Sequence, residues 1–172
     1  MTIQAYKLFA EQDNSPLHVG VTEAGTLFSG TIKSAVGIGS ILSLGLGDTL
    51  RVSLTGEPVE EVKTGWQIVS ALDLRRKGPE IISCPTCGRT EINLIDLAQK
   101  VENMLQCSKS LVTVAVMGCA VNGPGEAREA DYGIAGGTCQ GLIFKKGTIL
   151  KKVNEDILLK EFENILKEDG II

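Results

Sequence analysis

An alternation of helix and strand signals over residues 1–77 restricts the fold of this chain more than any other feature. Apolar residues recur at helical or strand spacing, and glycine, proline and asparagine separate the segments. We expect helices at about 1–11, 27–44 and 56–74, and strands at 17–21 and 49–54. Because a helix that joins two strands is typical of a parallel βα crossover, the pattern predicts part of a larger α/β fold.

Polar residues gather at the carboxyl ends of both expected strands. Thr22 and Glu23 follow the first strand, and Arg51 and Ser53 lie on the second. In (β/α)8 barrels the catalytic groups lie at this rim, and the loops after the last two strands often bind phosphate. We therefore predict that residues 1–77 are the last two βα units of such a barrel, with a surface salt bridge as the alternative role of Arg51.

The pattern changes after a linker at residues 75–79. The expected elements are a strand at 80–83, a helix that Thr90 caps and that includes Leu105, a strand at 110–117, short strands at 132–135, 142–144 and 148–150, and a terminal helix that Asn154 caps. Lys146-Gly147 is a candidate hairpin turn between the last two strands. These signals predict a small α+β domain at residues 78–172.

The charge balance argues against a nucleic-acid partner, because 17 Lys and Arg against 21 Asp and Glu leave a formal net charge of −4. Nucleic-acid binding depends on clustered basic residues that neutralise phosphates. The sequence has no apolar stretch of the ~20 residues that span a bilayer, and its first residues lack a secretory signal pattern. We therefore expect a cytoplasmic protein without a membrane partner, whose five cysteines serve metal or redox chemistry.

The strongest chemical signal is Cys84-Pro85-Thr86-Cys87 together with Cys119, which follows Gly118. Each motif follows an expected strand, so the two loops meet at one end of a sheet if these strands are neighbours. Glycine and proline around the thiols let backbone amides donate hydrogen bonds to sulfur. Three thiolates suit zinc or an iron–sulfur cluster, but a structural zinc site normally has four Cys or His ligands. Iron–sulfur is therefore favoured over zinc.

A cubane cluster held by three cysteines leaves one iron without a thiolate. Glu126, seven residues after Cys119, is the candidate oxygen ligand, and such a ligand can give way to a substrate oxygen. Cys139 is a competing fourth ligand that would make an ordinary electron-transfer cluster, whereas Cys107 is expected to be a small buried residue. A redox disulfide within the CxxC pair and a zinc-stabilised structural module remain open.

Four ordered motifs closely resemble the 4-hydroxy-3-methylbut-2-enyl diphosphate synthase family, the iron–sulfur enzymes of the non-mevalonate isoprenoid pathway. They are His-Val-Gly-Val-Thr-Glu-Ala-Gly at 18–25, Gly-Asp-Thr-Leu-Arg-Val-Ser-Leu at 47–54, Ser-Cys-Pro-Thr-Cys-Gly-Arg at 83–89 and Gly-Cys-Ala-Val-Asn-Gly-Pro-Gly-Glu at 118–126. The resemblance implies the last two βα units of a (β/α)8 TIM barrel at residues 1–77. It also implies an α+β iron–sulfur domain, similar to a sulfite-reductase module, at residues 78–172.

The resemblance further implies an oxidoreductase activity. The family opens the ring of 2-C-methyl-D-erythritol 2,4-cyclodiphosphate in a two-electron reduction with loss of water, which gives 4-hydroxy-3-methylbut-2-enyl diphosphate. The matching positions here are Cys84, Cys87, Cys119 and Glu126 as ligands of a [4Fe-4S] cluster, Glu23 as acid/base, Arg51 and Ser53 as diphosphate contacts, and Asn122 as a substrate contact beside the cluster. Glu126 would also yield its iron to the substrate oxygen.

Partners follow from the same resemblance. Ferredoxin or flavodoxin supplies the electrons in the family, whose members form homodimers in which the cluster domain of one subunit closes over the barrel of the other. Family members also bring further basic residues for the diphosphate from earlier barrel strands. With Arg51 as the one arginine at the rim, we expect this chain by itself to turn over weakly or not at all.

Overall fold

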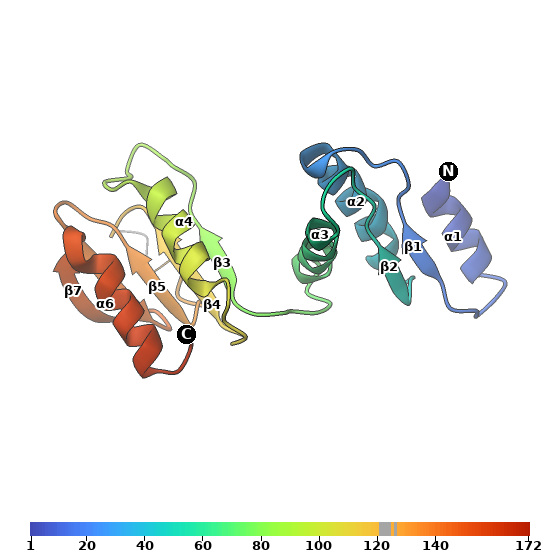
Figure 1. Cartoon of the computed structure of the whole chain (residues 1–172). Helices are drawn as coiled ribbons and strands as arrows, with labels where there is room; N and C mark the ends of the chain where they lie inside the picture. Colours follow the sequence, from blue (N-terminus) through green and yellow to red (C-terminus); the bar gives the residue numbers. More distant parts are fainter. Residues whose placement is uncertain (121–124, 126) are drawn as a thin grey trace. The chain divides into compact units, whose positions relative to one another are not determined.

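The computed structural model describes residues 1–120, 125 and 127–172, which form two compact units, Met1–Lys77 and Gly78–Ile172 (Figure 1). The first unit contains α1 (Thr2–Ala10), β1 (His18–Gly20), α2 (Leu27–Leu42), β2 (Thr49–Arg51) and α3 (Pro58–Ala71). β1 and β2 are parallel, with His18 opposite Thr49 and Gly20 opposite Arg51. The expected alternation of helices and parallel strands is therefore confirmed, although both strands are shorter than expected.

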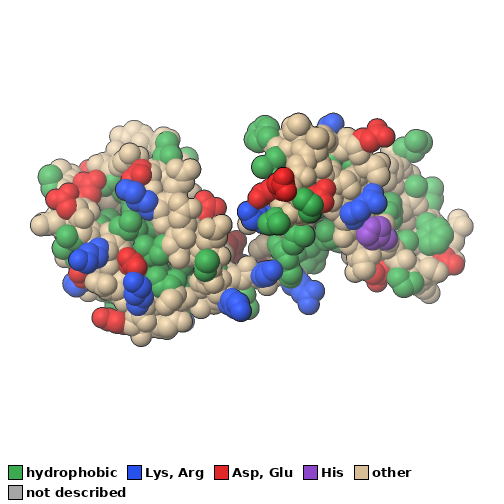
Figure 2. Space-filling model, in the orientation of Figure 1, with side chains coloured by type: hydrophobic (Ala, Val, Ile, Leu, Met, Phe, Trp, Pro, Cys, Tyr) green, Lys and Arg blue, Asp and Glu red, His purple; other side chains and the backbone are tan. Residues whose placement is uncertain are grey.

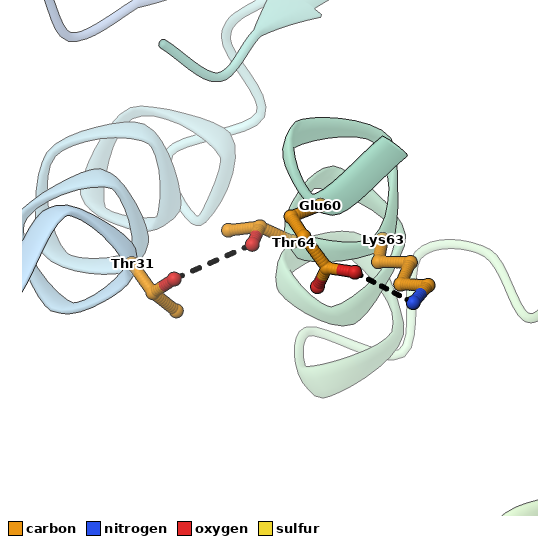
Figure 3. A network of polar contacts seen from close by, with 4 residues as sticks. All are labelled: Thr31, Glu60, Lys63 and Thr64. Atoms are coloured by element: carbon orange, nitrogen blue, oxygen red, sulfur yellow. Dashed lines mark hydrogen bonds and ion pairs between the residues drawn. The ribbon is translucent and has the colours of Figure 1, made fainter. Parts of the chain in front are cut away.

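The core of the first unit lies between the two strands and the helices. Its buried residues are Val19, Ile38, Ile41, Val52 and Ile68. α2 and α3 also meet through polar atoms, because Oγ1 of Thr31 lies 3.3 Å from Oγ1 of Thr64 (Figure 3). On the same helix as Thr64, Lys63 forms an exposed ion pair with Glu60. α3 begins at Pro58 with acidic residues in its first turn, which suits the positive end of the helix dipole.

The second unit is a five-stranded mixed sheet with two helices. Its elements are β3 (Glu80–Ser83), α4 (Leu94–Leu105), β4 (Thr113–Met117), β5 (Tyr132–Ala135), β6 (Gln140–Lys145), β7 (Thr148–Asn154) and α6 (Glu155–Glu168). The strand order is β3-β4-β5-β6-β7, with β3, β4 and β5 parallel and β6 and β7 added antiparallel. Residues of α4 and α6 pack in one cluster with Val114, Val116 and Ile134, so both helices cover the same face of the sheet (Figure 1).

The other face of this sheet carries a second core cluster. Small and apolar residues from β4, β5 and β6 form it together with a segment before β5; its members are Ala115, Met117, Ala127, Ala130, Ala135, Leu142 and Phe144. Because alternate residues of β4 enter the two clusters, both faces of this strand are buried. None of the helices in the described residues is long and apolar enough to cross a bilayer.

The expected cap of α4 is wrong. The helix begins at Leu94, and Oδ1 of Asn93 accepts the N–H of Asp96 at 3.3 Å. Thr90 instead belongs to the preceding loop, because its N–H donates to the carbonyl oxygen of Cys87 at 3.0 Å. Asn154 does precede α6, as expected, but its side chain makes no capping hydrogen bond within the described residues.

The hairpin between β6 and β7 turns at Lys146-Gly147, as the sequence predicts. Both residues are left-handed, with φ of 48° and 73°, which is the conformation that a two-residue hairpin turn requires. The pairing shifts between Ile143 and Phe144, and β7 beyond it is an edge strand. Two adjacent lysines, Lys151 and Lys152, lie exposed on that edge strand.

Candidate functional site

The two strands of the first unit divide their side chains between two faces. Val19 and Val52 are buried in the core, and because side chains alternate along a strand, His18, Thr49 and Arg51 lie on the opposite face. Nδ1 of His18 lies 2.8 Å from Oγ1 of Thr49 on the neighbouring strand. The single histidine is exposed and is purple in Figure 2. Polar side chains therefore occupy a face that branched apolar residues would fill in an ordinary barrel interior.

Arg51 lies against Gly20, its partner on β1. A Cβ atom at position 20 would be 3.1 Å from the backbone oxygen of Arg51 and 3.7 Å from its Nε. The tighter of these two contacts is with the backbone, so glycine at position 20 suits the close approach of the two strands. The Arg51 guanidinium is exposed at the carboxyl end of β2. A planar guanidinium binds phosphate oxygens through paired hydrogen bonds, so this position suits an anionic ligand.

Glu23 lies in the loop that follows β1. Its φ is 57°, a left-handed conformation that residues other than glycine seldom adopt and that clusters at functional sites. The N–H of Thr55 donates to the carbonyl oxygen of Gly25 at 2.9 Å, and Thr26 pairs with Thr55. These contacts join the loop that carries the exposed Glu23 to the segment that carries the half-buried Ser53. The structure thus brings the two loops together at the carboxyl ends of the strands.

A hollow of about 700 Å³ opens beside β2 and α3. Apolar side chains make up much of its lining, which includes Leu50, Val52, Val62, Trp66 and Val69, and the charged groups around it are Asp48, Arg51, Glu61 and Arg75. Within the described residues β2 pairs along one edge only, with β1, and β1 contributes nothing to the hollow. The hollow therefore lies beside the strand edge that lacks a partner, and its apolar lining does not suit a diphosphate.

The cysteine motifs follow neighbouring strands of the second unit. β3 and β4 are parallel, with Ser83 opposite Val116, so Cys84 and Cys119 follow the same end of the sheet. The N–H of Gly118 donates to Sγ of Cys84 at 3.2 Å, and the N–H of Cys84 donates to the carbonyl oxygen of Val116 at 3.4 Å. This confirms the prediction that a backbone amide near the thiols donates to sulfur.

The loop after Cys87 is tied to the end of β4. The N–H of Glu91 donates to the carbonyl oxygen of Gly118 at 3.0 Å. The pKa of Cys87 is lowered, chiefly because the backbone N–H of Arg89 donates to the sulfur, while desolvation acts in the opposite direction. The Arg89 side chain and the Thr90 hydroxyl also favour the thiolate. The thiolate is the form of cysteine that binds metals, so this loop favours the ligating form of Cys87.

The three predicted thiol ligands differ in exposure. Cys119 is buried, Cys84 is half-buried and Cys87 is exposed, and none of them forms a disulfide. Among the residues that the structure describes, no three Cys, His, Asp or Glu side chains lie close enough to hold one metal ion. A cubane cluster carries its irons at separate corners, so its thiolates need not converge on one point. The donor set and the amide at Cys84 therefore fit a cluster better than a single zinc ion.

Four other residues singled out in the sequence have different outcomes. Asn122 and Glu126 lie outside the described residues. Cys107 is exposed, so the expectation that it is buried is wrong; it lies two residues after Leu105, the last residue of α4, and therefore beyond the apolar face of that helix. Cys139 is also exposed, with a left-handed φ of 59°.

Sequence reasoning assigned Thr90 to a helix cap and did not place it at the cysteine site. Oγ1 of Thr90 is buried, and no atom within the described residues forms a hydrogen bond with it. Its methyl group and hydroxyl approach Gly118, where a Cβ atom would be 2.9 Å from each. The one signal in the sequence that could have found it is its position three residues after Cys87, directly after the cysteine motif at 83–89.

Two family models match this chain. The model of the GcpE TIM-barrel domain matches residues 1–66, and the model of the GcpE protein C-terminal domain matches residues 80–168. The two matches lie within the two compact units of the structure.

The curated relatives include proteins of Geobacter sulfurreducens, Maridesulfovibrio salexigens and Caldanaerobacter subterraneus. They are 60%, 61% and 60% identical to this chain, and each carries the name 4-hydroxy-3-methylbut-2-en-1-yl diphosphate synthase (flavodoxin). The matches cover 97%, 97% and 98% of this chain but 48%, 48% and 49% of the relatives. The chain therefore spans about half the length of the curated relatives it matches.

Proposed function

Because this chain belongs to the GcpE family, we propose that it acts as the C-terminal half of a 4-hydroxy-3-methylbut-2-enyl diphosphate synthase. The proposed reaction is the two-electron reductive opening of 2-C-methyl-D-erythritol 2,4-cyclodiphosphate with loss of water. The observation that carries the proposal is the pairing of β3 with β4, which places the loops of Cys84 and Cys119 together and aims the Gly118 amide at sulfur.

In this proposal Cys84, Cys87, Cys119 and Glu126 hold a [4Fe-4S] cluster. When bound, the cluster supplies the electrons and a Lewis-acidic iron. The protein contributes the lowered pKa of Cys87 and the amide that donates to Cys84, both of which favour sulfur in its anionic form. Asn122 is proposed to contact the substrate beside this site.

The substrate side of the proposal rests on the first unit. Arg51 binds the diphosphate through its exposed guanidinium, and Ser53 adds a hydroxyl. Glu23 moves a proton at the hydroxyl that leaves as water, and its exposed position in the left-handed loop suits that role. The support for these three assignments is their placement in joined loops at the carboxyl ends of two parallel strands.

We also propose that residues 1–77 are the last two βα units of a TIM barrel and that residues 78–172 are a module similar to that of sulfite reductases. The free edge of β2, with the apolar hollow beside it, suits the addition of a further strand. The rest of such a barrel brings further cations for the diphosphate, so this chain alone is proposed to turn over weakly or not at all. Flavodoxin, which the relatives' names mention, or ferredoxin is the proposed electron donor, and the complete protein is proposed to be a cytoplasmic homodimer.

Anaerobic reconstitution with iron and sulfide tests the cluster. We expect the chain to become brown and to bind both elements, Cys119→Ser to lose most of the bound iron and sulfide, and Cys107→Ser to match the unchanged chain. Cys107 is the control because it is exposed and lies outside both motifs. A colourless protein with stoichiometric zinc would instead support the structural module.

The fourth ligand distinguishes the reductase from an electron-transfer domain. We expect Glu126→Ala to alter the redox spectrum of the cluster and Cys139→Ser to leave it unchanged. The opposite result, with the cluster lost only in Cys139→Ser, would overturn the ligand assignment. Turnover of the cyclodiphosphate with reduced flavodoxin is the direct assay, and near-normal rates for this chain alone would contradict the expected weak activity.

A further inference from the structure

Thr90 has a buried hydroxyl without a role in the described fold. Its Oγ1 is shielded from solvent, and no atom in the described part of the chain accepts or donates a hydrogen bond there. Native proteins leave few buried polar atoms unpaired, and each exception calls for a physical reason. Capping does not supply one, because the side chain of Asn93 caps α4.

The backbone around Thr90 is fixed from two sides. Its own N–H donates to the carbonyl oxygen of Cys87, and the N–H of Glu91 donates to the carbonyl oxygen of Gly118, both at 3.0 Å. Gly118 in turn donates its N–H to Sγ of Cys84. Thr90 is therefore held between the two loops that carry the thiols.

Gly118 accommodates this arrangement because it lacks a side chain. A Cβ atom at position 118 would be 2.9 Å from both Oγ1 and Cγ2 of Thr90 and 3.3 Å from Cδ2 of Leu94. The methyl group of Thr90 fills this space, and valine would fill it equally well. Packing thus accounts for the methyl group and leaves the hydroxyl unexplained.

The loop places Thr90 beside Cys87, because the N–H of Thr90 donates to the carbonyl oxygen of Cys87 at 3.0 Å, and the sulfur of Cys87 is the acceptor that this arrangement offers to the hydroxyl. The Thr90 hydroxyl lies close enough to stabilise charge on that sulfur, although it does not meet the geometry of a formed hydrogen bond with it. In the cluster-bound form the ligand sulfurs would be deprotonated and inorganic sulfides would lie beside them, and both accept hydrogen bonds better than a thiol does. The hydroxyl then has a stronger acceptor than the Cys87 thiol of the unloaded chain.

We propose that Thr90 is a positioning residue whose hydroxyl donates a hydrogen bond to the sulfur of Cys87, or to an adjacent sulfide, in the cluster-loaded protein. The inference rests on the proposed function, because it requires a cluster at this site. Its consequence is electronic: a hydrogen bond to a cluster sulfur favours the more negative, reduced state. Thr90 therefore raises the reduction potential of the cluster.

The test is an anaerobic redox titration of the reconstituted full chain, with iron and sulfide content measured first. Thr90→Val removes the hydroxyl and keeps the shape, Thr90→Ser keeps the hydroxyl, and Thr86→Val removes an exposed hydroxyl from the same loop. We expect Thr90→Val to shift the midpoint to a more negative potential. At the midpoint potential of the unchanged chain, the ratio of reduced to oxidised cluster in Thr90→Val should be roughly twofold to tenfold lower than in the unchanged chain. Thr90→Ser and Thr86→Val should keep the original midpoint.

The outcomes separate this inference from the proposed function. If the unchanged chain binds no iron and sulfide, both fail. If all variants load the cluster and Thr90→Val keeps the original midpoint, the inference alone fails. Should Thr90→Val not hold a cluster, Thr90→Ser decides: normal loading by the serine variant supports a role for the hydroxyl, and failure of both variants overturns it.

Discussion

The pairing of Gly133 with Phe144 across β5 and β6 makes a sharp prediction about the second unit. A Cβ atom at position 133 would lie 2.1 Å from Cζ and 2.4 Å from Cε2 of the Phe144 ring. Carbon atoms approach to about 3.5–4.0 Å, so Gly133→Ala requires the ring to move by roughly 1.5 Å. Phe144 is fully buried within the second core cluster, which leaves the ring little space.

We expect Gly133→Ala to destabilise the second unit by about 3 kcal/mol, at the upper end of the usual cost of overpacking a core. For a domain of this size, each kcal/mol lowers the melting temperature by about 4–8 °C. Hydrogen exchange of peptides from β4 and β5, measured at increasing urea concentrations, gives the unfolding free energy of the second unit. The fluorescence of Trp66, the only tryptophan, reports the first unit and should not change.

A double-mutant cycle identifies the cause. In a Phe144→Leu background the ring is gone, so Gly133→Ala should cost less than about 1 kcal/mol there. Gly88→Ala is the control within the same unit, because a Cβ atom at that position meets nothing within 4 Å. An equal cost of Gly133→Ala in both backgrounds would refute the steric reasoning, as would an unchanged stability in the original background.

Two further predictions concern polar groups. Lys145, and to a smaller extent Tyr132, donate hydrogen bonds to the carboxylate of Asp169 and hold its pKa below the usual range. The carboxylate therefore stabilises the folded state at any pH above the pKa that Asp169 has in the unfolded chain. This stabilisation is lost as the pH falls through the lower pKa of the folded state. Asp169→Asn should therefore lower the urea midpoint of the second unit at pH 6. The difference from the unchanged protein should shrink as the pH falls below about 4 and disappear once the pH is below the folded pKa; a constant difference across pH would contradict this. Ser34 has a fully buried Oγ without a hydrogen-bond partner among the described residues. Ser34→Ala should therefore raise the unfolding free energy of the first unit by up to about 1 kcal/mol, measured through Trp66 fluorescence. A lower unfolding free energy in this variant would contradict the prediction.

Local signals in the sequence predict much of this fold. Strands at residues 80–83 and 132–135 have the expected bounds. The turn at Lys146-Gly147 is predicted because its conformation depends on two adjacent residues. The start of α4 is not predictable in this way, because a bond from Glu91 to Gly118, far along the chain, keeps Thr90 out of the helix.

In the candidate site, too, features that depend on neighbouring residues are predictable and features that depend on distant segments are not. Cysteine spacing identifies the thiols, and glycine near the thiols indicates an amide donor, which the bond from Gly118 to Cys84 confirms. The pairing of β3 with β4 could only be stated as a condition, because the order of strands depends on packing between distant segments. The contact between Arg51 and Gly20 likewise depends on strand register, which neither residue reveals alone.

The outer strand of the second unit also affects how copies of this protein behave in concentrated solution. The outer edge of β7 presents backbone N–H and C=O groups that could pair with a strand of another molecule. The irregular pairing of β6 and β7 near Phe144 disturbs the regular strand geometry that such pairing requires. Lys151 forms an ion pair with Glu161 of α6, whereas Lys152 is an exposed positive charge on this strand, so identical strands that approach one another bring like charges together and repel. These features oppose polymerisation through the unpaired edge of β7.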